Sequence, residues 1–144
     1  LRILPHQDKE GKLSLGVDMA YIHNRAYEYE RQIKLKDIDG MRTVDNWIRP
    51  QNTVNWEFKI DQPGEFILKA DIAAQEDALI DVVYGEEQKL TAKVEATGSD
   101  VSFMTRELGT IQFAEAGEHR LLLRGVRKDW TPIRLRAVHL EPKQ

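Results

Sequence analysis

Two tryptophan residues of this chain lie in polar segments, where an aromatic ring is well placed to meet a ligand. Trp47 belongs to residues 45–52 and Trp130 to residues 127–132, and both segments carry proline and several charged side chains. A flat indole can stack on the apolar face of a pyranose, while planar polar side chains hold the sugar hydroxyls. The residues that we predict to bind a ligand are Asn46, Trp47, Arg49, Asp129 and Trp130.

A second interpretation applies to the same two tryptophans: each ring could close an open end of a hydrophobic core. Trp56 differs from both, because it lies in the middle of an alternating segment and is predicted to be a core anchor. One observation, the exposure of the two rings, distinguishes the two interpretations of Trp47 and Trp130. A binding platform requires both rings to be exposed at one end of the molecule, whereas a core plug requires them to be buried.

The other chemistry-bearing residues form no catalytic or metal-binding motif. The His-Glu-x-x-His zinc motif, the phosphate-binding loop and the Gly-x-Ser-x-Gly motif are absent. The absence of cysteine excludes disulfides, thiolate metal sites and a cysteine nucleophile. The pairs Asp37/Asp39 and Asp77/Asp81 lack the twelve-residue calcium-loop pattern and are interpreted as turn carboxylates. The four histidines are isolated in sequence: His6, His23, His119 and His139.

The elements that must position these residues are strands, because apolar side chains recur with a period of two. In residues 53–60 the side chains of Val54, Trp56, Phe58 and Ile60 share one face. A Pro-Gly turn follows, and the alternation resumes over 65–72, which predicts a hairpin. Strands are expected over residues 13–17, 27–31, 53–60, 65–72, 78–84, 89–95, 108–113, 118–124 and 133–140. This spacing predicts an all-β protein, an antiparallel β-sandwich or jelly roll.

Length and composition agree with one compact domain. The 144 residues are 41% hydrophobic and 31% charged, and the net charge of −3 argues against a nucleic-acid partner. A mean hydropathy of −0.53 and the lack of a long apolar run argue against a membrane span. Residues 13–142 are predicted to form the domain, preceded by an exposed lead-in over residues 1–12. The chain starts with leucine, so we expect it to be part of a longer or processed protein.

From about Leu13 to Pro142 the chain resembles the C-terminal β-sandwich domain of bacterial α-L-fucosidases. It is similar, more loosely, to the galactose-binding-like jelly rolls that serve as carbohydrate-binding modules. The features that carry the resemblance are Trp47 and Trp56 nine residues apart, Pro63-Gly64-Glu65-Phe66, Leu108-Gly109-Thr110-Ile111, Ala116-Gly117-Glu118-His119-Arg120-Leu121 and the closing segment from Leu135 to Pro142.

The resemblance implies a non-catalytic carbohydrate-binding or accessory module of a secreted glycoside hydrolase. Its partners would be a carbohydrate and a catalytic domain in the same polypeptide, and its location extracellular or periplasmic. Asp129 and Trp130 match the loop that commonly contacts the sugar, and Trp47 could supply an opposing surface. The alternatives are a purely structural domain that packs against a catalytic or partner domain and, less favoured, an enzyme in its own right.

The same resemblance bears on cofactors. Related modules often begin with an acidic pair that holds a structural calcium ion. Here the corresponding strand, residues 13–17, is followed by the single carboxylate of Asp18. We therefore expect no cofactor and no metal ion, and structural calcium remains the alternative.

Overall fold

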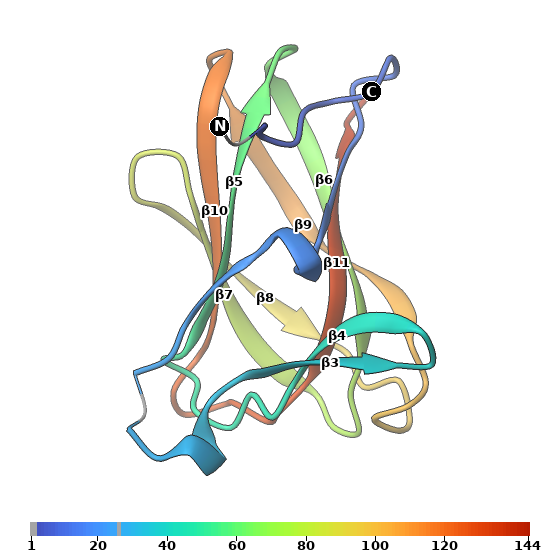
Figure 1. The fold of residues 1–144 in the computed structure, drawn as a ribbon. Helices are drawn as coiled ribbons and strands as arrows, with labels where there is room; N and C mark the ends of the chain where they lie inside the picture. The colour runs from blue at the N-terminus through green and yellow to red at the C-terminus, as the bar shows by residue number, and fades with distance from the viewer. Residues whose placement is uncertain (1–2, 26) are drawn as a thin grey trace.

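The computed structural model describes residues 3–25 and 27–144, which form two antiparallel β-sheets packed face to face (Figure 1). The six-stranded sheet has the order β3-β4-β11-β6-β9, with β1 also paired to β11, and the five-stranded sheet has the order β2-β5-β10-β7-β8. The predicted β-sandwich is confirmed. The six-stranded sheet contains β1 (Leu13–Gly16), β3 (Lys34–Ile38), β4 (Met41–Asp45), β6 (Gly64–Ala73), β9 (Met104–Phe113) and β11 (Arg134–Pro142). The five-stranded sheet contains β2 (Tyr21–His23), β5 (Thr53–Ile60), β7 (Ala78–Tyr84), β8 (Gln88–Val94) and β10 (Gly117–Gly125).

The alternating face of β5 is buried as its sequence predicts. Val54, Trp56, Phe58 and Ile60 are all fully inaccessible and belong to the core between the two sheets. The indole Nε1 of Trp56 donates a hydrogen bond to the carbonyl of Gly16, 2.8 Å away, and so connects the core anchor to the end of β1. A buried indole N–H needs such a partner, because leaving it unsatisfied is costly.

The predicted hairpin over residues 53–72 is wrong, since β5 and β6 belong to different sheets. β5 pairs with β2 and β10, whereas β6 pairs with β9 and β11. The turn at residues 61–63 therefore carries the chain across the core. The expected strand at 27–31 is also wrong: its residues are exposed, and Tyr29–Arg31 form a 3-10 turn. Period two identifies a half-buried strand, but pairing depends on partners elsewhere in the chain.

The N-terminal segment packs more closely against the sandwich than the prediction of an exposed lead-in implies. Gln7 is only 6% exposed, and its amide group makes four hydrogen bonds. Its Oε1 accepts from the backbone N–H groups of Asp61 and Gln62, each at 2.7 Å, and its Nε2 donates to the carbonyls of Gly11 and Gln62. The expectation of exposure therefore fails at Gln7, because this side chain satisfies the backbone of the β5–β6 turn.

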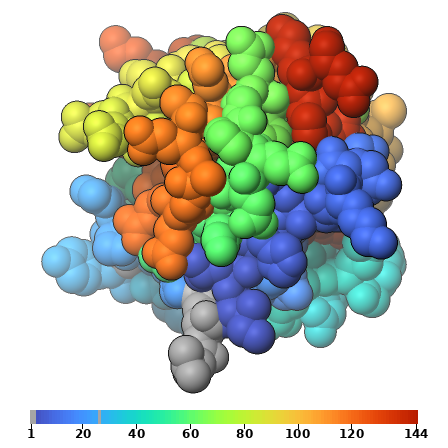
Figure 2. All heavy atoms as spheres, turned by 90° about the horizontal axis from the view of Figure 1, so that it is seen from above, coloured from blue at the N-terminus to red at the C-terminus, as the bar shows by residue number. Residues whose placement is uncertain are grey.

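The two ends of the sandwich are built differently. The C-terminus and the short turns β5–β6 and β9–β10 lie at the upper end in Figure 1, and Figure 2 views the molecule from that end. The longer connections, residues 46–52 and 126–133, lie at the opposite end, which we call the loop end. Within the described ranges, no helix has the length and apolar character needed to cross a membrane.

Candidate functional site

Trp47 and Trp130 meet at the loop end, but they do not form an open platform. Their ring centroids are 4.9 Å apart with an interplanar angle of 55°, and the Nε1 of Trp130 donates to the carbonyl of Trp47 at 2.8 Å. Trp47 is 0% exposed, and its own Nε1 donates to the carbonyl of Asn52 at 3.0 Å. The expectation that Trp47 presents its ring to a ligand is therefore wrong.

The path of the chain around Trp47 explains its burial. Asn46 has a positive φ of 60°, and its side-chain Nδ2 donates to the carbonyls of Glu30 and Gln32 at 2.7 and 2.9 Å. Asparagine tolerates this left-handed backbone better than most residues. The tight bend that follows β4 turns the next side chain into the core. The hydrogen-bonding donors of Asn46 are thus used to hold the β2–β3 connection.

Trp130 lies at the rim of the loop end and is partly exposed. Its ring packs against Gly125, the last residue of β10. A Cβ atom placed on Gly125 would lie 2.5 Å from Cδ2 of Trp130 and 2.8 Å from Cβ of Pro50. The absence of a side chain at Gly125 therefore leaves the space that the indole occupies. Trp130 is half-buried and packs against the core, so it combines a fixed position with an accessible edge.

The first hollow at the loop end has Trp130 among its lining residues and a volume of about 320 Å³. Asp77 and Lys93 form an ion pair across it, with 3.3 Å between Nζ and Oδ2. The backbone N–H of Ala96, and then Lys93, lower the pKa of Asp77 below its ordinary value. The hollow is lined by Asp77, Ala78, Leu79, Lys93, Lys128, Asp129, Trp130 and Thr131.

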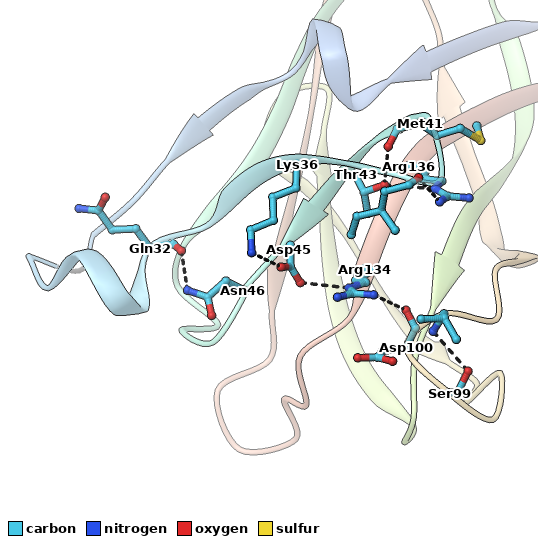
Figure 3. Close-up of polar contacts among 12 residues, drawn as sticks. Gln32, Lys36, Met41, Thr43, Asp45, Asn46, Ser99, Asp100, Arg134 and Arg136 are labelled. Carbon is cyan, nitrogen blue, oxygen red and sulfur yellow. Dashed lines mark hydrogen bonds and ion pairs between the residues drawn. The ribbon is translucent and has the colours of Figure 1, made fainter.

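Thr131 also lines a second hollow of about 410 Å³, and three residues of the polar network in Figure 3, Asp45, Asp100 and Arg134, belong to its lining. Arg134 donates from Nε to Asp45 at 3.1 Å and from Nη1 to the carbonyl of Asp100 at 2.9 Å, while Lys36 approaches Asp45 to 3.2 Å. Partial burial alone would raise the pKa of Asp45, but hydrogen bonds from Arg134 and Lys36 outweigh it and lower the pKa. The lining is completed by Asn46, Ile48, Gln75, Glu76, Pro132 and Ile133.

The five predicted residues thus have four different positions. Asp129 and Trp130 line the first hollow, Asn46 lines the second, and Trp47 belongs to the core. Arg49 lines neither hollow; its buried Nε has no hydrogen-bond partner within residues 3–25 and 27–144.

Sequence reasoning missed Asp45, Thr131 and Arg134. Arg134 could have been found from the polar face of the last alternating segment. No local pattern indicates that Asp45 lies beside it, because the two are 89 positions apart.

The chemistry of these hollows favours binding over proton transfer. A general acid at neutral pH needs a carboxyl group with a raised pKa. Asp45 and Asp77 instead have lowered pKa values and pair with cations, so both remain hydrogen-bond acceptors. No group of three or more His, Asp or Glu side chains suited to a metal ion occurs in the part of the chain that the structure describes.

Comparison with solved structures shows the same fold in carbohydrate-binding modules. A family 35 module from Clostridium thermocellum is 12% identical, with a TM-score of 0.72 over 92% of this chain and 98% of that one. CsCBM6-3 from Clostridium stercorarium, solved with cellobiose, is 14% identical, with a TM-score of 0.65 over 99% and 100%. The Podospora anserina GH26-CBM35 β-(1,4)-mannanase is 14% identical, with a TM-score of 0.66; the match covers 94% of this chain but 28% of the mannanase.

At these identities the structural similarity establishes the fold. Among curated proteins, no sequence matches the chain significantly. Residues 24–134 match the family described as a domain of unknown function, DUF5077. The matched segment includes β3 to β10, both tryptophans of the loop end and most of the lining of the two hollows. The chain therefore belongs to the DUF5077 family, whose member described here is a β-sandwich.

Proposed function

We propose that this domain is a non-catalytic carbohydrate-binding module that recognises sugar at the loop end. The observation that carries the proposal is that half-buried Trp130 lines one polar hollow together with Asp129, while the next residue, Thr131, lines that hollow and a second one. Ligand sites combine an apolar surface with a few fixed polar groups. Here Trp130 supplies the apolar surface, and Asp77 and Asp129 supply acceptors for sugar hydroxyls.

The size of the hollows is consistent with recognition of a short saccharide. At about 320 and 410 Å³, both are near the lower end of the range for small-molecule sites. Both are open to solvent, so water competes for every hydrogen bond. We therefore expect a dissociation constant of about 10⁻⁵ to 10⁻³ M, which corresponds to about −4 to −7 kcal/mol.

The test is a titration of the intact domain against a panel of oligosaccharides, followed by calorimetry and by Trp fluorescence. Trp130→Ala should weaken binding at least tenfold, and Trp130→Phe should retain part of the affinity because a ring remains. Gln112→Ala is the matched control, since Gln112 is exposed and lines a hollow at the opposite end. If no saccharide binds, or if Trp130→Ala binds as tightly as the control, the proposal is wrong.

A second candidate function, docking onto a partner domain, is favoured by exposed apolar side chains near the loop end. Tyr27 is 99%, Tyr29 69% and Ile48 43% exposed. Asn46 connects the segment of Tyr29 to the loop of Ile48 through its two hydrogen bonds. The double variant Tyr27→Ala/Tyr29→Ala separates the two functions, because neither side chain lines a hollow of the loop end. It should leave sugar affinity unchanged, and it should weaken association with a neighbouring domain if these side chains mediate docking.

The wider context also belongs to the proposal. In the mannanase, a domain of this fold occupies 28% of a longer enzyme. We propose that this domain likewise accompanies a glycoside hydrolase, such as an α-L-fucosidase, in an extracellular or periplasmic protein. Mass spectrometry of the native protein would establish which further domains share the polypeptide.

A further inference from the structure

Three side chains on the outer face of the six-stranded sheet form a Ser-His-Asp chain of hydrogen bonds. Ser14 Oγ lies 2.9 Å from Nδ1 of His139, and Nε2 of His139 lies 2.8 Å from Oδ2 of Asp71. The three residues come from β1, β11 and β6, which are neighbours in the sheet. This group, which we call the serine relay, is not part of the loop end.

The strand register builds the serine relay. Ser14 is directly opposite His139 in the β1–β11 pair, and the alternation of β1 buries Leu13 and Leu15 while leaving Ser14 exposed. Asp71 projects from the adjacent strand. Its second oxygen, Oδ1, accepts a hydrogen bond from the hydroxyl of Thr105 at 2.6 Å. All four side chains are thus held on one face by backbone pairing.

The hydrogen bonds also select one tautomer of a neutral His139. An ionised Asp71 carboxylate can only accept, so the single imidazole proton is then on Nε2 and points to Asp71. The other ring nitrogen, Nδ1, then carries a lone pair and accepts the proton of the Ser14 hydroxyl. This is the arrangement in which a histidine acts as a base toward a serine. Here the two ring nitrogens exchange the positions that they have in serine proteases.

We propose that Ser14 is a reactive serine that accepts an acyl group from small activated esters. Its Oγ attacks the ester carbonyl, and its proton moves to Nδ1 of His139. The C–O bond to the leaving alcohol then breaks, and the alkoxide takes the proton back from His139. The products are one acyl-serine and one alcohol per chain. The serine relay is therefore a modification site on a domain whose proposed sugar-binding role is separate.

The position of Ser14 sets the expected size of the effect. The residue is exposed, so an ester can reach it, and so can the water that solvates the oxyanion. The rate gain then comes from the base, which typically contributes about 10²–10⁴-fold. Lys69, opposite His139 in the β6–β11 pair, forms an ion pair with Glu141 at 2.9 Å on the same face. It is the neighbouring amine that must be distinguished as an acylation site.

The test uses p-nitrophenyl acetate with the intact domain, an acid quench at early times, and peptide mapping by mass spectrometry. Ser14 should be acetylated at least 100-fold faster than Ser102, an exposed serine that serves as the internal reference. His139→Gln should remove this advantage, and Ser14→Ala should remove the modified peptide. Equal rates at Ser14 and Ser102, or acetylation unaffected by His139→Gln, would overturn the proposal.

Asp71 is a positioning residue in this scheme, and it requires a different readout. Asp71→Asn can donate a hydrogen bond to Nε2, which would move the ring proton to Nδ1 and turn it toward Ser14. We expect acetylation at least tenfold slower, together with a change of tautomer in the ¹⁵N spectrum of His139. A tautomer change without a slower reaction would show that the base is not used and would contradict the proposal.

Discussion

The two ends of the sandwich differ in the size of their hollows and in the side chains that line them: the larger hollow lies at one end, and the partly exposed tryptophan lies at the other. The end that carries the β5–β6 and β9–β10 turns, which we call the turn end, holds the largest of the hollows described here, about 690 Å³. Its lining includes Glu57, Glu86, Glu115 and Glu118. Its aromatic residue, Phe113, is 1% exposed. The loop end has smaller hollows but presents Trp130 beside them. Because the proposed recognition of a sugar requires an accessible apolar ring, the smaller hollows of the loop end fit it better than the larger one.

The lengths of the connections account for this difference. At the turn end, residues 61–63 and 114–116 join strands directly, and the side chains that surround the hollow come mainly from strand ends. At the loop end, residues 46–52 and 126–133 are long enough to carry residues of their own into a site. Loops that a rigid scaffold positions are where binding residues usually occur.

Trp47→Ala should have the largest effect on stability, because the ring is fully buried and its Nε1 is hydrogen-bonded. We expect the free energy of unfolding to fall by about 3–5 kcal/mol, as for other large aromatic residues removed from a core. Urea denaturation measures this change. Trp130→Ala is the matched comparison and should cost less, because its ring is partly exposed. A larger loss for Trp130→Ala would show that the structural roles of the two rings are reversed.

Gly125→Ala should have the next largest effect, because the new methyl group would overlap Trp130 and Pro50. Overpacking of this kind costs about 1–3 kcal/mol. The displaced indole should also weaken sugar binding. A double-mutant cycle with Trp130→Ala checks the cause. If removing the indole relieves none of the destabilisation, the contact between Gly125 and Trp130 is not its source.

Gln7→Ala should destabilise the turn end by about 1–2 kcal/mol, because it removes the hydrogen bonds that the backbone N–H groups of Asp61 and Gln62 donate to Gln7 in the β5–β6 turn. Hydrogen exchange should report the change at Asp61 and Gln62. Sugar affinity should be unaffected, since Gln7 is remote from the loop end. A loss of affinity as large as that of Trp130→Ala would mean that the two ends are coupled.

The sequence predicted the sandwich and its core well, because alternation is a local signal that burial enforces. The apolar face of β5 needed no knowledge of its neighbours. Pairing was predicted poorly, since β5 and β6 each find partners far along the chain. A turn between two alternating segments is compatible with a hairpin and with a crossing between sheets, so the segments 53–60 and 65–72 could not distinguish them.

The loop end was harder to predict for a related reason. Trp47 and Trp130 have similar polar neighbours in sequence, yet one is core and the other rim. The difference comes from the backbone bend at Asn46 and from the space beside Gly125 that the Trp130 indole fills. Both features depend on contacts between residues that are distant in sequence. Asp129 and Trp130 lie at a hollow, as a binding role requires, but that role remains a prediction.

The smallest expected effects concern single carboxylates at the two ends. The pKa of Asp45 is lowered in the folded state, so its contribution to stability is present above the unfolded-state pKa of about 4 and is lost as the pH falls through the folded-state value. Asp45→Asn should therefore cost on the order of 1 kcal/mol at pH 7 and nothing at low pH, where the wild-type carboxyl is also neutral. Urea denaturation across this pH range measures the difference.

Glu57→Gln is the matched variant at the turn end, where Glu57 forms an exposed ion pair with Arg120 at 3.2 Å. Solvent screens such pairs, so we expect a change in unfolding free energy of no more than a few tenths of a kcal/mol at pH 7. The contrast arises because Asp45 has two cationic partners and is shielded by the loops around it, whereas Glu57 lies at an open surface. Equal losses for the two variants at pH 7 would show that the loop end does not shield its polar network from water, and the argument for sugar recognition there would lose its electrostatic support.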